Sequence, residues 1–200
     1  MKFNRRSIRL KGYNYSKNGL YYITISTYKD QYLFGFIDNE IMMLNSAGKL
    51  VERILFEIDN EFINARVLDY VIMPNHVHFV VEIYKDKDED KDGVDMESTR
   101  TNAVGADSIS AHDKDSISAQ DKDPPKASLG QIIQMFKRYS TIEYIKNVKN
   151  EISPPFYKKV WHRNYYEHII RNKKDYKRIS DYIRDNPKNW EKDRSNYKDG

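Results

Sequence analysis

Hydrophobic and polar positions alternate with a period of two at residues 76–83, and further short apolar runs occur within the first 84 residues. Asp38-Asn39 and Pro74-Asn75 separate such runs, and both pairs favour tight turns between extended segments. The turns, together with many β-branched and aromatic residues, predict strands that are joined by short connections. The predicted strands are residues 20–27, 32–37, 40–44, 67–73 and 76–84.

Two further segments carry apolar residues at the three- and four-residue spacing of an amphipathic helix. The first follows Asn45 or Ser46, either of which can cap it, and the second follows Ser128. We expect the apolar stripe of each helix to pack in the core. The stripes are Ala47, Leu50, Val51, Ile54, Leu55 and Ile58 in the first helix, and Leu129, Ile132, Ile133, Phe136 and Tyr139 in the second.

A third helix is predicted near the C-terminus, after a short extended segment at residues 160–170. It follows Asn172, and Asp175 stands three residues later in the manner of a capping box. Pro187 disfavours helical geometry at the residue before it, so the helix should end at Asn186. Its buried stripe is predicted to be Tyr176, Ile179 and Ile183.

Residues 85–126 differ in kind from both flanks. They carry 12 acidic and 7 basic residues, and an eight-residue repeat runs in tandem from Asp107 to Lys122. A segment of this composition cannot bury enough apolar surface to offset its ordering entropy, so we expect a disordered acidic insertion. Residues 1–84 and 127–200 are then predicted to form the two parts of one domain.

Composition excludes several classes of function. The chain has no cysteine, which rules out disulfides, cysteine nucleophiles and zinc knuckles. No segment looks like a signal peptide or a membrane span, so we expect a cytoplasmic protein with no membrane partner. Outside residues 85–126 the net charge is +9, and the whole chain holds 16 tyrosines. This combination suits a polyanion that offers phosphates and stacking bases, although a lysine-rich surface that only confers solubility would look the same.

The candidate chemistry begins at His76-Val77-His78. In a strand, alternation places His76 and His78 on one face with Val80 and Glu82, and leaves a wholly apolar set on the other face. The two imidazoles start about 7 Å apart, from a rise of about 3.3 Å per residue. Such a pair can hold one divalent metal ion and leave other coordination positions open. The alternative is two polar residues on a wetted sheet face.

The third helix offers a chemical partner for these histidines. Arg178, Tyr182 and Asn186 recur at four-residue spacing and form a second stripe at the edge of the buried one. A phenol and an amide one turn apart can provide a nucleophile and a third metal ligand. The alternative for Tyr182 is a half-buried helix aromatic without a chemical role.

Taken in order along the chain, these features resemble the REP-associated tyrosine transposases, single-tyrosine HUH enzymes of the transposase IS200-like superfamily. The resemblance covers nearly everything outside residues 85–126, and that insertion departs from the family pattern. The matching stretches are residues 5–13 (RRSIRLKGY), 70–78 (YVIMPNHVH), 128–133 (SLGQII), 160–172 (VWHRNYYEHIIRN) and 181–187 (DYIRDNP).

The resemblance implies an α+β, ferredoxin-like HUH fold, an antiparallel sheet with helices packed on one face and the histidine strand near its centre. It implies that His76, His78 and Asn186 bind Mg²⁺ or Mn²⁺ and that Tyr182 is the nucleophile. The implied substrate is single-stranded DNA that presents a hairpin, in particular a repetitive extragenic palindrome, cleaved through a 5′-phosphotyrosine. Such an enzyme would work at the nucleoid as a monomer or a homodimer.

Basic and aromatic residues near these motifs are candidate DNA contacts, with ordinary solvated charge as the alternative for the basic ones. They are Arg5, Arg6, Arg9, Lys11, Lys137, Arg138, Arg163, Arg171, Tyr165 and Tyr166. Two other functions stay open at this point. One is a metal-dependent phosphohydrolase that uses the histidines and water without a covalent step. The other is a non-catalytic hairpin-binding protein derived from a transposase.

Overall fold

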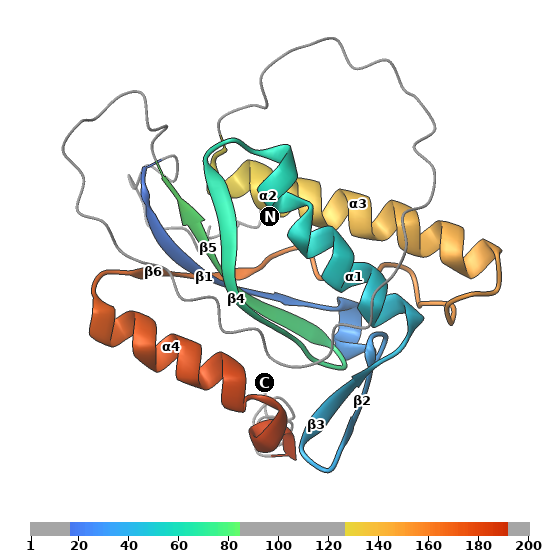
Figure 1. Ribbon diagram of the computed structural model, residues 1–200. Helices are drawn as coiled ribbons and strands as arrows, with labels where there is room; N and C mark the ends of the chain where they lie inside the picture. Colours follow the sequence, from blue (N-terminus) through green and yellow to red (C-terminus); the bar gives the residue numbers. More distant parts are fainter. Residues whose placement is uncertain (1–16, 85–126, 192–200) are drawn as a thin grey trace, which may run out of the picture.

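The computed structural model describes residues 17–84 and 127–191 (Figure 1). The predictions for the acidic insertion at residues 85–126 and for the C-terminal residues after 191 therefore lie outside the described residues. The same holds for four of the candidate DNA contacts, namely Arg5, Arg6, Arg9 and Lys11.

Four strands form one antiparallel sheet in the order β4-β5-β1-β6. Helix α1 (Ser46–Phe56) connects β1 to β4, and helix α3 (Leu129–Lys149) connects β5 to β6. This βαββαβ order with the strand that carries the histidines inside the sheet is the ferredoxin-like arrangement. The predicted α+β class and antiparallel sheet are thus confirmed. The strands are β1 (Gly19–Ser26), β4 (Ala65–Ile72), β5 (His76–Ile83) and β6 (Tyr166–Ile170).

Helices cover both faces of this sheet, as Figure 1 shows. The expected helix layer on one face is formed by α1 (Ser46–Phe56), α2 (Ile58–Glu61) and α3 (Leu129–Lys149). In addition, α4 (Lys173–Asp185) packs on the opposite face through Ile179 and Ile183. The prediction of helices on one face therefore holds for α1, α2 and α3 and is wrong for α4.

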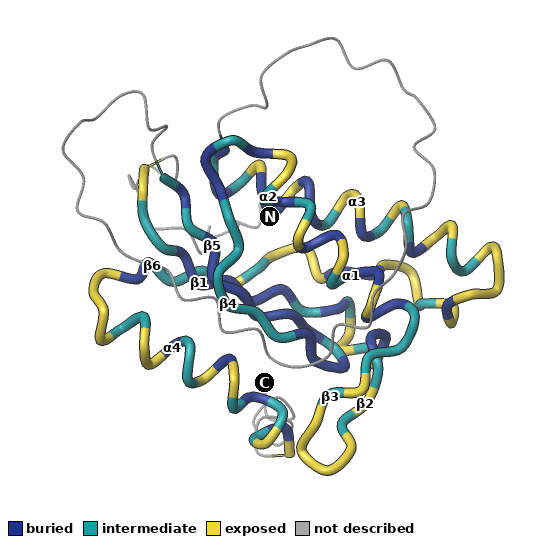
Figure 2. Tube along the Cα trace, in the orientation of Figure 1, coloured by how far each residue is buried: buried dark blue, intermediate teal, exposed yellow. Residues whose placement is uncertain are grey.

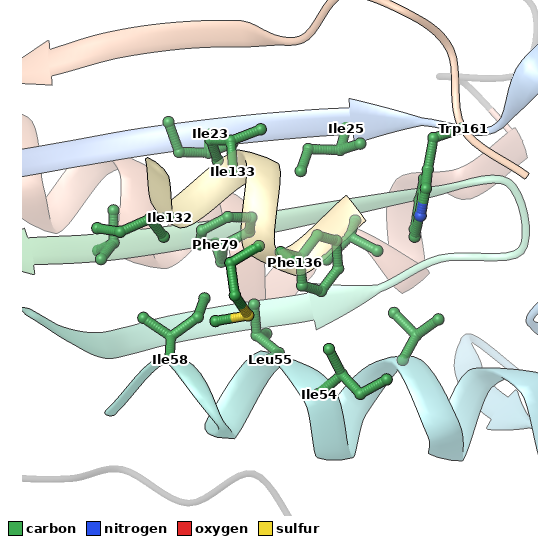
Figure 3. Close-up of a cluster of buried hydrophobic side chains, with 14 of the residues drawn as sticks. Ile23, Ile25, Ile54, Leu55, Ile58, Phe79, Ile132, Ile133, Phe136 and Trp161 are labelled. Atoms are coloured by element: carbon green, nitrogen blue, oxygen red, sulfur yellow. The ribbon is translucent and has the colours of Figure 1, made fainter. Parts of the chain in front are cut away.

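Alternation along β5 divides the core as predicted. Val77, Phe79, Val81 and Ile83 all belong to the cluster between the sheet and helices α1 and α3. Figure 3 shows Phe79 within this cluster. Each such side chain stabilises the fold by roughly 1.5–3 kcal/mol when it leaves water. Val80, on the other face, belongs to a smaller cluster under α4. Figure 2 shows β1 and β5 mostly buried, β4 and β6 mostly at intermediate burial, and the outer sides of the helices exposed.

The predicted helix caps form. Asn45 Oδ1 accepts a hydrogen bond from the Gly48 amide at 2.9 Å, so α1 begins where its cap predicts. Ser128 and Gln131 form a complete capping box at the start of α3. The stripe predicted for α3 is buried except for Tyr139, which is 37% exposed.

The start of α4 forms only half of the expected capping box. Asn172 Oδ1 accepts from the Asp175 amide at 2.9 Å. The Asp175 carboxylate, however, binds His168 and Arg178, both at 2.8 Å, instead of returning to Asn172. Hydrogen bonds from His168 and Arg178 lower the pKa of Asp175 to about 2.

The end of α4 departs from its prediction in one respect. The α-helix stops at Asp185, but Asn186 keeps helical dihedral angles (φ −57°, ψ −45°) although Pro187 follows it. The chain then continues into a single 3₁₀ turn, η2 (Pro187–Asn189). Proline at the first position of such a turn needs no amide hydrogen bond, so the chain continues without a break.

A hairpin made of β2 (Gly35–Asp38) and β3 (Ile41–Leu44) extends beyond the main sheet. Its turn residues are Asn39 and Glu40, with φ of 47° and 65°, which is one position later than predicted. Positive φ at both central residues matches the right-handed twist of the paired strands. Within the ranges that the structure describes, no helix is both long and apolar enough to cross a lipid bilayer.

Candidate active site

The two sequence clusters that were predicted to cooperate meet on the face of the sheet beneath α4. The rings of His76 and His78 have their centres 4.5 Å apart on β5. The ring of Tyr182 lies 5.4 Å from that of His78, and the Asn186 side chain interacts with His76. Residues more than a hundred positions apart in the sequence thus form one local group.

Hydrogen bonds fix how each imidazole points. His76 Nδ1 lies 2.7 Å from Asn75 Oδ1, and an amide oxygen can only accept, so the ring proton is on Nδ1. The lone pair of His76 is therefore on Nε2. His78 Nδ1 lies 2.8 Å from both the Tyr22 and the Thr24 hydroxyls. Nε2 is then the ring nitrogen of His78 that remains for a ligand.

Both histidines are neutral near pH 7. Each is only 4% exposed. Burial lowers the pKa of His76 to about 4, and a hydrogen-bonding contribution from Asn186 opposes that shift. Burial, followed by repulsion from His76, lowers the pKa of His78 well below its usual value. Neutral imidazoles keep the lone pairs that a metal ion requires.

These residues fit a divalent cation. His76 Nε2 is buried and has no hydrogen-bond partner of ordinary geometry within the described chain. Leaving such a nitrogen unused costs free energy, which a bound cation would recover. Residues 17–84 and 127–191 contain no group of three or more His, Cys, Asp or Glu side chains suited to a metal. A third protein ligand at this place would therefore be the fully buried Asn186.

Tyr182 combines contact with the histidines and access to solvent. It is 42% exposed, and its ring meets that of Tyr22 edge-on at 6.3 Å. Helix α4 keeps it there through the buried Ile179 and Ile183, and through a 3.1 Å hydrogen bond from Ser180 to Asp69. The phenol can therefore meet a large substrate while its neighbours stay buried.

A cleft of about 470 Å³ adjoins the site. It lies between the β2–β3 hairpin and the residues that follow α4, and Pro74 and Trp190 are among its lining residues. The Trp190 ring lies 6.0 Å from that of His76 and 5.6 Å from that of Tyr32. The cleft thus borders the His76 end of the site.

Lys137, one of the predicted DNA contacts, has partners within the chain. Its ammonium binds the backbone oxygens of His162, Arg163 and Asn164 at 3.0, 3.3 and 3.0 Å. An ammonium group has three N–H donors, so these three carbonyls occupy all of them in this structure. Lys137 thereby ties α3 to the segment before β6, and its contact with DNA stays a prediction.

The other predicted DNA contacts within the described residues lie at different places in the fold. Arg138 is exposed on α3, on the side of the sheet away from the histidines. Arg163 and Arg171 are exposed before and after β6. Tyr165 is partly buried against the large core, whereas Tyr166 is 53% exposed on the histidine face.

Sequence reasoning missed the residues that orient the imidazoles. Tyr22 and Thr24 alternate on one face of β1, which the sequence could have indicated. Their contact with His78 depends on the register, which pairs Thr24 with His78. The sequence indicates only a turn at Asn75 and gives no signal for Trp190.

The fold and this group of side chains together define a ferredoxin-like α+β protein with a histidine pair on its sheet. No family model matches the chain. An uncharacterized protein of Haemophilus influenzae is 37% identical over 191 residues, which cover 95% of this chain and 92% of that protein. The chain belongs to the same family as that protein.

Two solved structures overlap this fold in part. A REP-associated tyrosine transposase bound to a REP hairpin gives a TM-score of 0.48 at 14% identity, over 92% of this chain and 73% of that one. A protein of Deinococcus radiodurans, provisionally described as a transposase, gives 0.44 at 12% identity, over 89% and 96%. Both likenesses are weak, so the roles proposed below rest on the side chains of the site itself.

Proposed function

We propose that this protein is a metal-dependent, single-tyrosine DNA strand-cleaving and strand-transferring enzyme of the HUH transposase class. Its substrate would be single-stranded DNA that presents a hairpin, of the REP palindrome type. The observation that carries the proposal is the meeting of Tyr182 and Asn186 with His76 and His78 on one face of the sheet. A nucleophile, two neutral imidazoles and an amide are the groups that such chemistry needs.

His76, His78 and Asn186 would hold the cofactor, Mg²⁺ or Mn²⁺. Imidazole nitrogen favours Mn²⁺, whereas the amide oxygen suits either ion. When bound, the ion would draw charge from the oxygens of the scissile phosphate and stabilise the transition state. Asn75, Tyr22 and Thr24 hold the imidazole rings in place through their Nδ1 atoms.

Tyr182 performs the covalent step. Its hydroxyl oxygen attacks phosphorus, the bond from phosphorus to the 3′ oxygen breaks, and a 5′-phosphotyrosine forms. A phenol with an ordinary pKa of about 10 is mostly protonated near pH 7, so its proton must leave as it attacks. Tyr182 is 42% exposed, so water can take that proton and return one to the leaving 3′ oxygen. A second 3′ hydroxyl can later reverse the step and join two strands without ATP.

Capture of the covalent adduct tests this proposal. A labelled single strand that carries a hairpin is mixed with the protein and Mn²⁺, and adducts are resolved under denaturing conditions. Tyr182→Phe should abolish the adduct and keep DNA binding. Tyr166→Phe is the matched control, because Tyr166 is also exposed and its ring is also 6.3 Å from that of Tyr22.

Three other outcomes would overturn the proposal. Strand cleavage that persists in Tyr182→Phe would assign the reaction to water and make the protein a phosphohydrolase. Loss of the adduct in Tyr166→Phe alone would assign the nucleophile to that residue. Tight hairpin binding by the wild type with no cleavage in Mg²⁺ or Mn²⁺ would identify a non-catalytic DNA-binding protein.

A further inference from the structure

A second group of basic and aromatic residues lies on the surface, outside the set that holds the histidines. Two stacked tyrosines form its centre, Tyr28 and Tyr157, with ring centres 6.4 Å apart and planes at 19°. The ammonium groups of Lys29 and Lys158 lie 5.3 and 5.2 Å from the Tyr157 ring. That of Lys159 lies 5.9 Å from the Tyr28 ring. We call these five residues the lysine–tyrosine patch.

The patch is built from two segments that one side chain ties together. Gln31 Nε2 donates to the carbonyls of Tyr28, Tyr157 and Lys159 at 2.6, 3.2 and 3.2 Å. Gln31 Oε1 accepts from the Tyr157 amide. The Tyr28 amide also donates to the Val160 carbonyl at 2.9 Å. These bonds fix the backbone under the lysines before any partner arrives.

The backbone of the patch is held in a costly conformation. Lys29, Asp30 and Lys158 have φ of 57°, 52° and 60°, in the left-handed region that side chains with a Cβ rarely adopt. The described parts of the chain contain six such residues other than glycine, so half of them lie in or beside the patch. Strain of this kind persists where surrounding contacts enforce it, often at surfaces that bind a ligand.

The patch is connected to the candidate active site through the turn before β5. The Thr27 amide donates to the Asn75 carbonyl at 2.8 Å, and the Asn75 side chain orients His76. Tyr28 follows Thr27 directly, at the end of β1 whose Ser26 pairs with His76. The patch and the histidines therefore lie toward the same end of the sheet.

We infer that the lysine–tyrosine patch binds the phosphodiester backbone of the DNA substrate, away from the bond that is cleaved. The inference rests on the DNA-cleaving function proposed above. Three exposed ammonium groups surround the rings, with Asp30 as the neighbouring carboxylate, so the patch attracts polyanions. Half-exposed Tyr157 adds a ring and a hydroxyl that can contact a base or a phosphate. None of these five residues was singled out by the sequence motifs.

Salt-dependent binding tests the inference. The variant replaces Lys29, Lys158 and Lys159 with Gln. The control replaces three exposed lysines of the helix layer, Lys49, Lys146 and Lys149, with Gln, which changes the net charge equally. Both variants and the wild type are titrated with one hairpin carrying an unpaired flank and, separately, with the unpaired strand alone.

The patch variant should bind about ten- to a hundredfold more weakly near 0.15 M salt. The slope of its plot of log affinity against log salt should be smaller in magnitude by roughly 2 to 3. Each lost phosphate contact reduces that slope by about 0.9 on duplex DNA or about 0.7 on a single strand. The control should follow the wild type. Loss with the hairpin alone assigns the patch to the stem, and loss with both DNAs assigns it to the unpaired strand. Either result supports the inference.

Equal behaviour of the patch variant and the control would overturn it. A patch variant with normal DNA affinity would also overturn the inference, even if that variant had lost affinity for an acidic protein. The binding measurement does not depend on cleavage. Absence of a Tyr182 adduct in the wild type would overturn the proposed enzyme while the salt comparison still decides the patch.

Discussion

The two faces of the sheet differ in how many apolar side chains they bury. On the α1 and α3 face, a continuous cluster of buried side chains includes every inward residue of β5. On the α4 face, the buried apolar cluster of the described chain has five members, and histidine and threonine side chains are buried beside it. Apolar burial is the main favourable term in folding, so the first face provides most of the stability.

The α4 face can contain buried polar side chains because the α1 and α3 face provides most of the apolar burial. Burying His76 and His78 stabilises the protein less than burying two aliphatic residues would, since polar groups lose hydration. Their hydrogen bonds to Asn75, Tyr22 and Thr24 recover part of that loss. Comparison of the faces therefore predicts which substitutions affect stability and which affect activity.

The largest effect on the free energy of unfolding is expected from Phe136→Ala on the α1 and α3 face. Phe136 is fully buried, with ring centres 5.9 Å from Phe79 and 5.4 Å from Trp161. Its truncation should lower the free energy of unfolding by about 3–5 kcal/mol, measured by urea denaturation. Tyr182→Phe should change it by less than about 0.5 kcal/mol while abolishing the adduct. Similar losses in both variants would contradict the division between the faces.

The next effect comes from protonation of His76. Its folded pKa of about 4 lies below the ordinary 6.5, so only the unfolded chain binds a proton between these values. Stability should therefore be complete above pH 6.5 and fall as the pH drops to 4, by at most about 3 kcal/mol from this residue. Denaturation across this pH range, with a chelator present, measures this loss of stability. His76→Gln should show a shallower dependence, and an unchanged slope would contradict the assignment.

Lys137→Ala should destabilise the protein. Removal of the ammonium leaves three backbone carbonyls with fewer partners, which costs about 2 kcal/mol. Arg138→Ala, at the next and exposed position, should be nearly neutral. Thermal unfolding and hairpin binding of the two variants give the test. A loss of affinity with unchanged stability would contradict this prediction and favour the DNA contact.

The smallest effect is expected from Thr24→Val. The variant keeps the shape of the side chain but removes one of the two hydroxyls at His78 Nδ1. Weaker orientation of the ring should reduce Mn²⁺ affinity about tenfold, or about 1.4 kcal/mol, as measured by calorimetry. Thr141→Val is the control, because that hydroxyl binds a helix carbonyl on the other side of the sheet. Equal affinities in both variants would show that Tyr22 alone holds His78.

Much of the framework was predictable from local patterns. The period of two assigned Val77 and Phe79 to the core and His76 and His78 to the opposite face, as the structure has them. Side-chain caps located the start of each long helix, because Asn45, Ser128 and Asn172 satisfy amides within their own turn. The metal and nucleophile roles remain predictions, although the residues assigned to them lie together.

The rest depended on contacts between distant segments. Nothing local to Thr24 shows that it pairs with His78, since the register of two strands is a property of the fold. The charge on Lys137 suggested DNA, but its partners lie 25 to 27 residues away. Gln31 likewise meets residues more than 120 positions later, so the lysine–tyrosine patch is invisible in the sequence.

Helix α4 follows the last strand of the sheet and rests on few apolar contacts. The strand that carries the imidazoles is instead paired on both sides, by β4 and β1. The imidazoles therefore sit on a strand held by two ladders of backbone hydrogen bonds, whereas Tyr182 sits on a helix held against the sheet by side chains. Substitutions at Ile179 or Ile183 should consequently displace Tyr182 while leaving the histidine strand in place.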